Sequence, residues 1–284
     1  MRTIRMMAMA CLLGTTLQPA AAFDLGSIDW KKAAETVQKV QKARTEIDEP
    51  QEIVLGDGIA SNLLGAAPLL DNAAVQRYVN RIGRWLASQT ERPDLPWLFG
   101  VLDDADVNAF ATPGGNVFIT KGLLARMNSE AELAGVLAHE ISHVVRKHHV
   151  QAIKKGAQAE LLTDLANDAI REKGGDPRLT KLVSAGTEVY ARGLDKNDEF
   201  EADRMGVVIA ARGGYDPYGL PAVLQTLQSL NPGDSGLALM FKTHPALADR
   251  LSRLDREMSG RFDNLENQPD LAPRFFQALG AENR

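Results

Sequence analysis

Cysteine is nearly absent from this sequence of 284 residues, in which Cys11 is the only one. Residues 1–22 have the order of a secretory signal, with Arg2 and Arg5 before a short apolar stretch and small residues up to Ala22. Cleavage after Ala22 would leave a mature chain without cysteine. Disulfide bonds are then excluded, and stability has to come from the apolar core and from any bound metal.

Long apolar runs are missing as well. No segment reaches the run of about 18 apolar residues that a membrane-spanning helix needs. Cys11 lies inside the apolar stretch of the signal and is followed by two leucines, which argues against a lipoprotein site. We therefore expect an exported protein of the bacterial periplasm whose mature chain is soluble or peripherally attached to a membrane.

The chain also lacks a basic excess. It has 32 Lys and Arg against 37 Asp and Glu, a formal net charge of −5, and losing the two arginines of residues 1–22 changes −5 to −7. This mild acidity offers no electrostatic footprint for nucleic acid, so we expect no nucleic-acid partner.

Apolar periodicity predicts a mainly α-helical fold with a small β-sheet, that is, an α+β protein. Residues 97–103 and 107–119 are rich in strand-forming residues, and Pro113-Gly114-Gly115 predicts a hairpin turn within the second run. Residues 51–70 are rich in Gly and Ala and only loosely patterned. Helices are predicted for 71–90 (with Val75, Tyr78, Val79, Ile82 and Trp85 on one side), for the segment around 139–143, and for 197–212, 217–230 and 245–258.

Four parts follow from these patterns. Residues 1–22 are the signal, and residues 23–50 hold an amphipathic helix that fits packing on the main body or a partner better than insertion in a membrane. Residues 51–258 form the main domain. Residues 259–284 form a polar tail that we expect to dock weakly or not at all.

The pentapeptide HEISH at 139–143 carries the strongest chemical signal. One helical turn separates His139 from His143, so both imidazoles lie on one face and can bind one zinc ion. Glu140 can then act as general base on a metal-activated water. The alternative is a surface helix that carries these residues by chance, but the apolar residues around the motif predict burial. Ser129 followed by Glu132 predicts a capping box at the start of this helix.

A catalytic zinc needs a third protein ligand. In the acidic segment NDEFEADRMG, Glu199 and Asp203 are four residues apart and share a helical face, whereas Glu201 points away. We predict Glu199 as the third ligand and Asp203 as the carboxylate that accepts the free N–H of a ligand histidine. A solvated acidic face is the alternative, but Gly206 and the apolar run after it predict packing into the core.

Together, HEISH, EFEAD and the hairpin NAFATPGGNVFIT resemble the metallopeptidase family that includes the CAAX prenyl protease and the heat-shock protease HtpX, in its soluble BepA-like branch. The resemblance covers roughly residues 50–255. It implies a zincin-type fold, one Zn²⁺ per chain on His139, His143 and Glu199, and protein substrates such as misfolded or misassembled envelope proteins. The chain lacks the C-terminal helical repeats of that branch, so we expect no partner binding through them.

Two further roles follow from the resemblance. Asn108, Ala109 and Phe110 match an exposed edge strand beside the metal, to which an extended substrate can add, although an ordinary covered edge is the alternative. His244, in a His-Pro segment, matches a histidine that can occupy the open position of the zinc and keep the enzyme latent. A capping or solvent-facing histidine is the alternative there.

Other polar residues remain without an assigned role. His148 and His149 have the wrong spacing to join His143 on a metal, and with lysines nearby they suggest a solvated face. Tyr190 and Arg250 are candidates for stabilising an oxyanion, but packing or surface roles fit them equally.

We predict a zinc endopeptidase. The alternatives are a chaperone-like or binding module with a zinc site and little proteolysis, which would not need Glu140, and a non-peptidase zinc hydrolase, which would not need the hairpin.

Overall fold

The computed structural model describes residues 46–164, 193–230, 235–265 and 267–280. The chain divides into two units, Met1–Glu46 and Ile47–Arg284, and all elements below belong to the second. The predicted signal (1–22) and most of the predicted N-terminal helix (23–50) lie outside the described residues. Helices predominate in the described part and accompany one three-stranded sheet, which confirms the α+β class.

The sheet contains the predicted hairpin. Its strands β1 (Leu98–Leu102), β2 (Ala109–Thr112) and β3 (Asn116–Thr120) lie in the order β1-β3-β2. β1 runs parallel to β3, and β2 pairs antiparallel with it. The turn places Gly114 at φ 80° and Gly115 at φ 112°, a region that residues with a Cβ rarely adopt. Because the strand order places β3 between β1 and β2, β2 is an edge strand.

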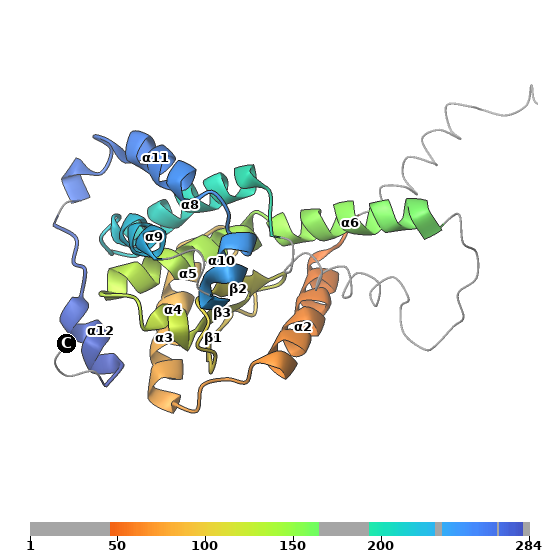
Figure 1. Ribbon diagram of the computed structural model, residues 1–284, viewed down its shortest axis with the longest axis horizontal. Helices are drawn as coiled ribbons and strands as arrows, with labels where there is room; N and C mark the ends of the chain where they lie inside the picture. Colours follow the sequence, from red (N-terminus) through yellow and green to blue (C-terminus); the bar gives the residue numbers. More distant parts are fainter. Residues whose placement is uncertain (1–45, 165–192, 231–234, 266, 281–284) are drawn as a thin grey trace, which may run out of the picture. The chain divides into compact units, whose positions relative to one another are not determined.

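The HEISH motif lies on α5 (Glu130–Val145), the central helix of the unit. All 16 of its residues are buried, as the apolar sequence around the motif predicts. The sheet lies on one side of α5, while α8 (Lys196–Arg212) and α9 (Gly219–Ser229) pack on the other (Figure 1). The motif therefore lies between the sheet and the helices α8 and α9.

Helix starts and buried faces largely follow the sequence. Ser129 caps α5 by accepting a hydrogen bond from Glu132 N, but the Glu132 carboxylate accepts from Asn128 N, so the capping box forms only in part. In α3 (Ala73–Ala87), Trp85 is half-exposed and not on the buried face. The other predicted residues of that face are buried: Val75, Tyr78, Val79 and Ile82.

Residues 51–70, which lack a clear pattern, form most of α2 (Glu49–Ala66). Asp48 caps this helix by accepting a hydrogen bond from Gln51 N. Gly56 lies so close to the hairpin that a Cβ there would fall 1.7 Å from Pro113 O. The small residues of this segment therefore permit close packing and do not indicate a loop.

Glu52 joins α2 to two other parts of the unit. Its carboxylate is fully buried, pairs with Arg92 and Lys147 at 2.9 Å each, and accepts a hydrogen bond from Gly114 N at 3.3 Å. Arg92 also donates to Val144 O near the end of α5. Burial opposes the charge of Glu52, but its two cationic partners outweigh this and lower its pKa.

The C-terminal tail docks firmly in part, so the prediction of weak docking is wrong for α12 (Ala272–Ala278). Phe275 is fully buried, and Arg274 forms an ion pair with the buried carboxylate of Glu130. One aromatic and one cation are enough to dock a short helix, and a polar average over the segment hides them. The same carboxylate accepts hydrogen bonds from Tyr78 at 2.7 Å and Tyr215 at 2.9 Å.

Within the described residues, no helix combines the length and the apolar character needed to cross a membrane. The predicted helices 217–230 and 245–258 correspond to α9 and to α11 (Leu247–Met258). The remaining elements are α4 (Lys121–Leu124), α6 (His148–Asp164), η2 (Ser235–Leu237), α10 (Ala238–Thr243) and η3 (Asp263–Leu265).

Candidate metal and catalytic site

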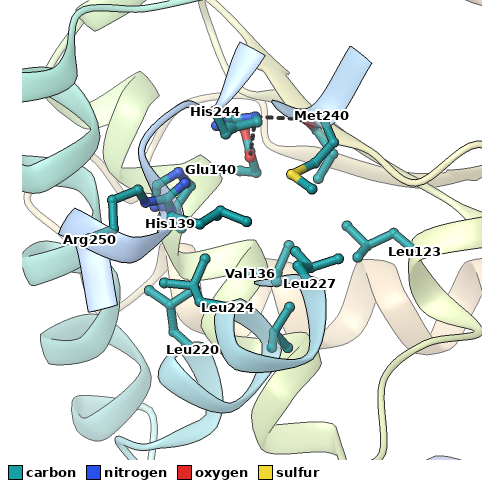
Figure 2. Close-up of a pocket in the computed structure, with 13 residues that line it drawn as sticks. Leu123, Val136, His139, Glu140, Leu220, Leu224, Leu227, Met240, His244 and Arg250 are labelled. Carbon is teal, nitrogen blue, oxygen red and sulfur yellow. Dashed lines mark hydrogen bonds and ion pairs between the residues drawn. The ribbon is translucent and has the colours of Figure 1, made fainter. Parts of the chain in front are cut away.

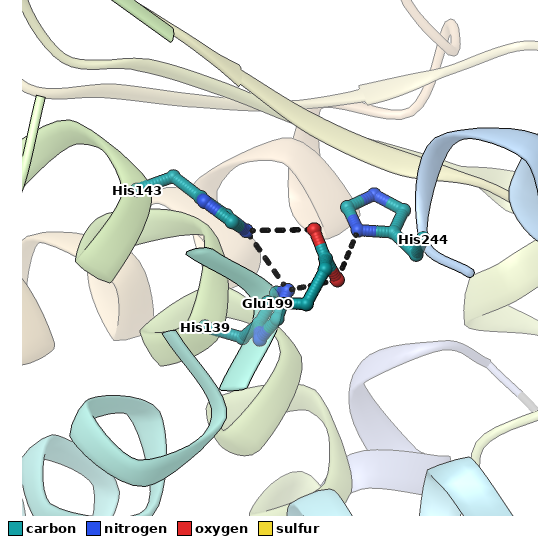
Figure 3. A group of neighbouring side chains, drawn as sticks. All are labelled: His139, His143, Glu199 and His244. Atoms are coloured by element: carbon teal, nitrogen blue, oxygen red, sulfur yellow. Dashed lines mark hydrogen bonds and ion pairs between the residues drawn. The ribbon is translucent and has the colours of Figure 1, made fainter. Parts of the chain in front are cut away.

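His139 and His143 project from one face of α5 toward a common point. Their Nε2 atoms are 3.1 Å apart, and the two side chains are 4% and 0% exposed (Figure 3). Burial lowers the pKa of His143 well below its ordinary value, so this ring is neutral. Two imidazole nitrogens that face each other at this distance need a shared cation or a proton between them.

Glu199, in the first turn of α8, meets both rings. Its Oε2 lies 3.6 Å from His139 Nε2, and its Oε1 lies 3.5 Å from His143 Nε2. Burial opposes its ionisation, but the nearby cations of His244 and Arg250 outweigh this and lower its pKa to about 2. A carboxylate with full negative charge therefore faces the two ring nitrogens.

Asp203, one turn further along α8, supports this arrangement. Its Oδ1 lies 3.0 Å from His139 Nδ1, which leaves Nε2 of that ring directed at Glu199. Arg250 donates to both carboxylate oxygens of Asp203, at 2.8 and 2.6 Å, and keeps the pKa of Asp203 well below its ordinary value despite burial. Gly206 permits the close approach of α8, because a Cβ there would lie 3.0 Å from His139 Cα.

His244 follows α10 and reaches the same cluster. Its Nδ1 lies 3.1 Å from Glu199 Oε2, and its Nε2 lies 3.3 Å from Ala109 O and 3.8 Å from Glu140 Oε1. Burial disfavours a charge on this ring, but the carboxylates of Glu199 and Glu140 outweigh it and raise its pKa to about 9. Ligand atoms of His139, His143, Glu199 and His244 all lie within 4.8 Å of one another.

Glu140 stands beside the cluster without joining it. The side chain is 1% exposed, and its Oε2 has no hydrogen-bond partner among the described residues. Burial raises its pKa. A buried carboxylate oxygen that lacks a partner and lies next to a cation site is well suited to accept a proton.

The prediction of a solvated face for His148 and His149 is wrong, since they are 2% and 7% exposed. Lys147, at φ 57°, links α5 to α6, and the ring centroids of His148 and His149 lie 5.1 and 5.5 Å from that of His143. His148 Nδ1 lies 2.9 Å from His143 Nδ1, and its Nε2 lies 3.4 Å from Glu201 Oε2. If His143 offers the Nε2 lone pair to a metal, its Nδ1 carries the proton and donates it to His148.

The predicted edge strand borders the cluster, but it is covered there. Asn108 and Ala109 are buried and Phe110 is partly buried. His244 approaches the carbonyl oxygen of Ala109, and Val107 N donates to Gly236 O. The segment that ends at His244 thus lies where an added strand would pair.

The donor set fits a tetrahedral zinc ion. Zinc bonds nitrogen and oxygen ligands at about 2.0–2.2 Å, which places neighbouring ligand atoms about 3.4 Å apart. The nearest contacts among His139, His143 and Glu199 are 3.1, 3.5 and 3.6 Å. Glu199 Oε1, which is buried, has no hydrogen-bond partner in the described part of the chain, so a cation would satisfy it.

Arg250 and His148 are the site residues whose contacts the sequence does not reveal. Arg250 has a signal in retrospect, because it shares the buried face of α11 with Leu247 and Leu254, where a charge requires a buried partner. Arg250 contacts two carboxylates, and Tyr190, the other oxyanion candidate, lies outside the described residues.

Comparison with known proteins gives one family match and several relatives. Residues 73–258 match the model of Peptidase family M48. The chain is similar to the Beta-barrel assembly-enhancing protease of Escherichia coli (strain K12), with 32% identity over 212 residues, which cover 71% of this chain and 42% of that protein. It thus spans less than half the length of this relative.

Two more distant relatives extend the comparison. The Mitochondrial metalloendopeptidase OMA1 of Arabidopsis thaliana is 29% identical over 179 residues, covering 63% of this chain and 35% of the relative. The Protease HtpX homolog of Burkholderia thailandensis is 30% identical over 246 residues, covering 73% of this chain and 83% of the relative.

Proposed function

Because the chain belongs to Peptidase family M48, we propose that it is a zinc-dependent endopeptidase that hydrolyses peptide bonds of protein substrates. The observation that carries the proposal is a buried cluster of two histidines and a glutamate beside Glu140, whose Oε2 lacks a hydrogen-bond partner in the described part. The first supplies cation ligands and the second supplies a proton acceptor.

In this proposal His139, His143 and Glu199 hold one zinc ion per chain. A zinc ion bound by these ligands supplies a Lewis acid that acidifies water near neutral pH and polarises a peptide carbonyl. Asp203 orients His139 through Nδ1, and Arg250 balances the charge of both carboxylates.

Glu140 is the proposed general base. Its Oε2 accepts a proton from the attacking water and then delivers it to the amine that leaves. Burial raises the pKa of this carboxyl and makes it a stronger base than an exposed glutamate. A binding module with a purely structural zinc would not need such a residue, and Glu140 therefore favours catalysis over that alternative.

The proposed substrate lies along β2. An extended peptide can pair with this edge strand at Asn108, Ala109 and Phe110, and its backbone then passes Glu140. The name of the Escherichia coli relative suggests envelope proteins as substrates and the periplasm as the place of action.

His244 is the proposed latch. In the structure its ring lies against Glu199 and the carbonyl of Ala109, so it would compete with water for a bound zinc ion and with a substrate strand for the edge of β2. We expect His244→Ala to keep its zinc and to cleave casein faster than the wild type, with self-cleavage as a side effect. Equal rates for the two proteins at equal zinc content would contradict the latch.

Metal removal tests the function itself. Treatment with a zinc chelator should abolish casein cleavage, and zinc added back should restore it, because His139, His143 and Glu199 then regain their ion. The zinc content before and after treatment is measured by elemental analysis. Cleavage that persists in the metal-free protein would contradict a zinc peptidase.

A further inference from the structure

An apolar cavity of about 40 Å³ lies directly beside Glu140. Figure 2 shows its leucines on one side and His139, Glu140, His244 and Arg250 on the other. A cavity of about 150 Å³ accommodates benzene, so this space as it stands admits only a small group. Its apolar walls include Val136 of α5, Leu220, Val223, Leu224 and Leu227 of α9, and Met240 of α10.

The position of the cavity follows from helix geometry. Val136 precedes Glu140 by one turn of α5, so its side chain lies on the same face as the proposed base. Ala109 of the edge strand also lines the cavity. A peptide paired with β2 would therefore present its backbone to Glu140, and one of its alternating side chains would point at the cavity.

The apolar wall that α9 gives to the cavity is firmly packed. Leu220, Val223 and Leu224 are 2 to 3% exposed, and no charged side chain interrupts the α9 wall. A charged or strongly polar side chain placed against the α9 wall would lose its hydration without gaining a partner from α9. An aliphatic side chain would gain apolar contact along this wall.

From this arrangement we propose that the cavity is the specificity subsite of the enzyme, which receives an aliphatic side chain such as leucine from a residue flanking the scissile bond. This inference rests on the proposed peptidase function and adds the substrate class. The carboxylate of Glu140 and the apolar wall then act on neighbouring parts of one peptide.

Met240 sets the size of the subsite. Its thioether, 3% exposed, points toward Val136 and Leu227 (Figure 2). Met240 O accepts a hydrogen bond from His244 N at 2.8 Å, so the two residues belong to one turn. A displacement of this turn that frees the ring of His244 would also withdraw Met240 and enlarge the subsite.

The test compares cleavage of peptides that differ at one residue. The zinc-loaded full chain is incubated with matched peptides carrying alanine, leucine, phenylalanine or aspartate at one varied position, and the cut sites are read by mass spectrometry. We expect the wild type to favour leucine over alanine by at least about 10-fold in kcat/KM, since each methylene in an apolar pocket contributes about 10- to 200-fold.

Two variants change the cavity in opposite directions. Leu224→Phe fills it and should shift the preference toward alanine, and Met240→Ala widens it and should shift the preference toward phenylalanine. Leu86→Ala, at a buried leucine of α3 that does not line the cavity, is the control for general destabilisation and should keep the wild-type preference.

The outcomes separate this inference from the function on which it rests. Cleavage with a leucine preference that moves in either folded cavity variant, but not in the control, supports the subsite. Cleavage with a preference that neither folded cavity variant alters would overturn the subsite and leave the peptidase function intact. A zinc-loaded wild type that cuts no peptide would overturn both.

Discussion

At the scale of single residues, two imidazoles and one carboxylate make the site, and further buried polar groups decide how these three point. Asp203 holds His139 through Nδ1, and His148 stands in the same relation to His143. The HExxH spacing was sufficient to predict His139, Glu140 and His143 as neighbours. It could not predict His148, because the positive φ of Lys147 is a backbone conformation that no residue pattern announces.

His148 should affect the metal without touching it. We expect His148→Ala to lower zinc affinity by about 10- to 100-fold, because the N–H at His143 Nδ1 loses its acceptor and the ring loses its orientation. Chelator competition measures the affinity. Gln151→Ala, at an exposed residue of α6, is the matched control, and equal affinity of both variants would rule out this role.

At the scale of elements, periodic segments were predicted well and closely packed ones were not. The apolar pattern predicted α5, α8 and the hairpin because each contributes a run of apolar residues to the core. The helix α2 was not predicted because its buried residues include Gly56, which packs closely because it has no side chain. The docking of α12 was not predicted because it depends on one buried phenylalanine, Phe275.

The contact between α5 and α8 gives a prediction about Gly206. An alanine Cβ there would press on the backbone of His139 at 3.0 Å, whereas Gly156 of α6 has nothing within 4 Å. Gly156→Ala should therefore stabilise the fold by up to about 1 kcal/mol through helix propensity. Gly206→Ala should forfeit that gain and weaken zinc binding, because α8 carries Glu199.

Thermal unfolding and chelator competition measure the two effects of these glycine variants. A Gly206→Ala protein that gains as much stability as Gly156→Ala, with unchanged zinc affinity, would show that α5 and α8 can accommodate a Cβ at position 206.

At the scale of the described unit, the site depends on segments far apart in the sequence. His139 and Glu199 are 60 residues apart in the chain, and His244 follows 45 residues after Glu199. The sequence predicted that these residues meet because its motifs resemble those of a metallopeptidase family. The apolar and charge patterns alone would not have predicted it. The covering of β2 by His244 was not predicted, since it depends on how the α10 segment packs.

The tail provides a prediction about pH. Burial opposes ionisation of Glu130, but Arg274 and two tyrosines outweigh it and lower its pKa below the ordinary value of 4.5. A lowered folded-state pKa stabilises the protein above the unfolded value, and this contribution is lost as the pH falls through the folded value. Glu130→Gln should therefore cost stability at neutral pH and progressively less in acid.

Urea unfolding of wild type and Glu130→Gln across this pH range measures the difference in the free energy of unfolding. A difference that stays constant on acidification would mean that the charge of Glu130 does not anchor α12.

The central claim is that Glu140 performs proton transfer at a zinc site built by His139, His143 and Glu199. Casein cleavage by wild type and Glu140→Gln, each with its zinc content measured, tests it most directly. We expect equal zinc, near one per chain, and a loss of cleavage of about two to four orders of magnitude in the variant, since an amide cannot accept the proton. A zinc-replete Glu140→Gln protein that cleaves casein at the wild-type rate would contradict the account.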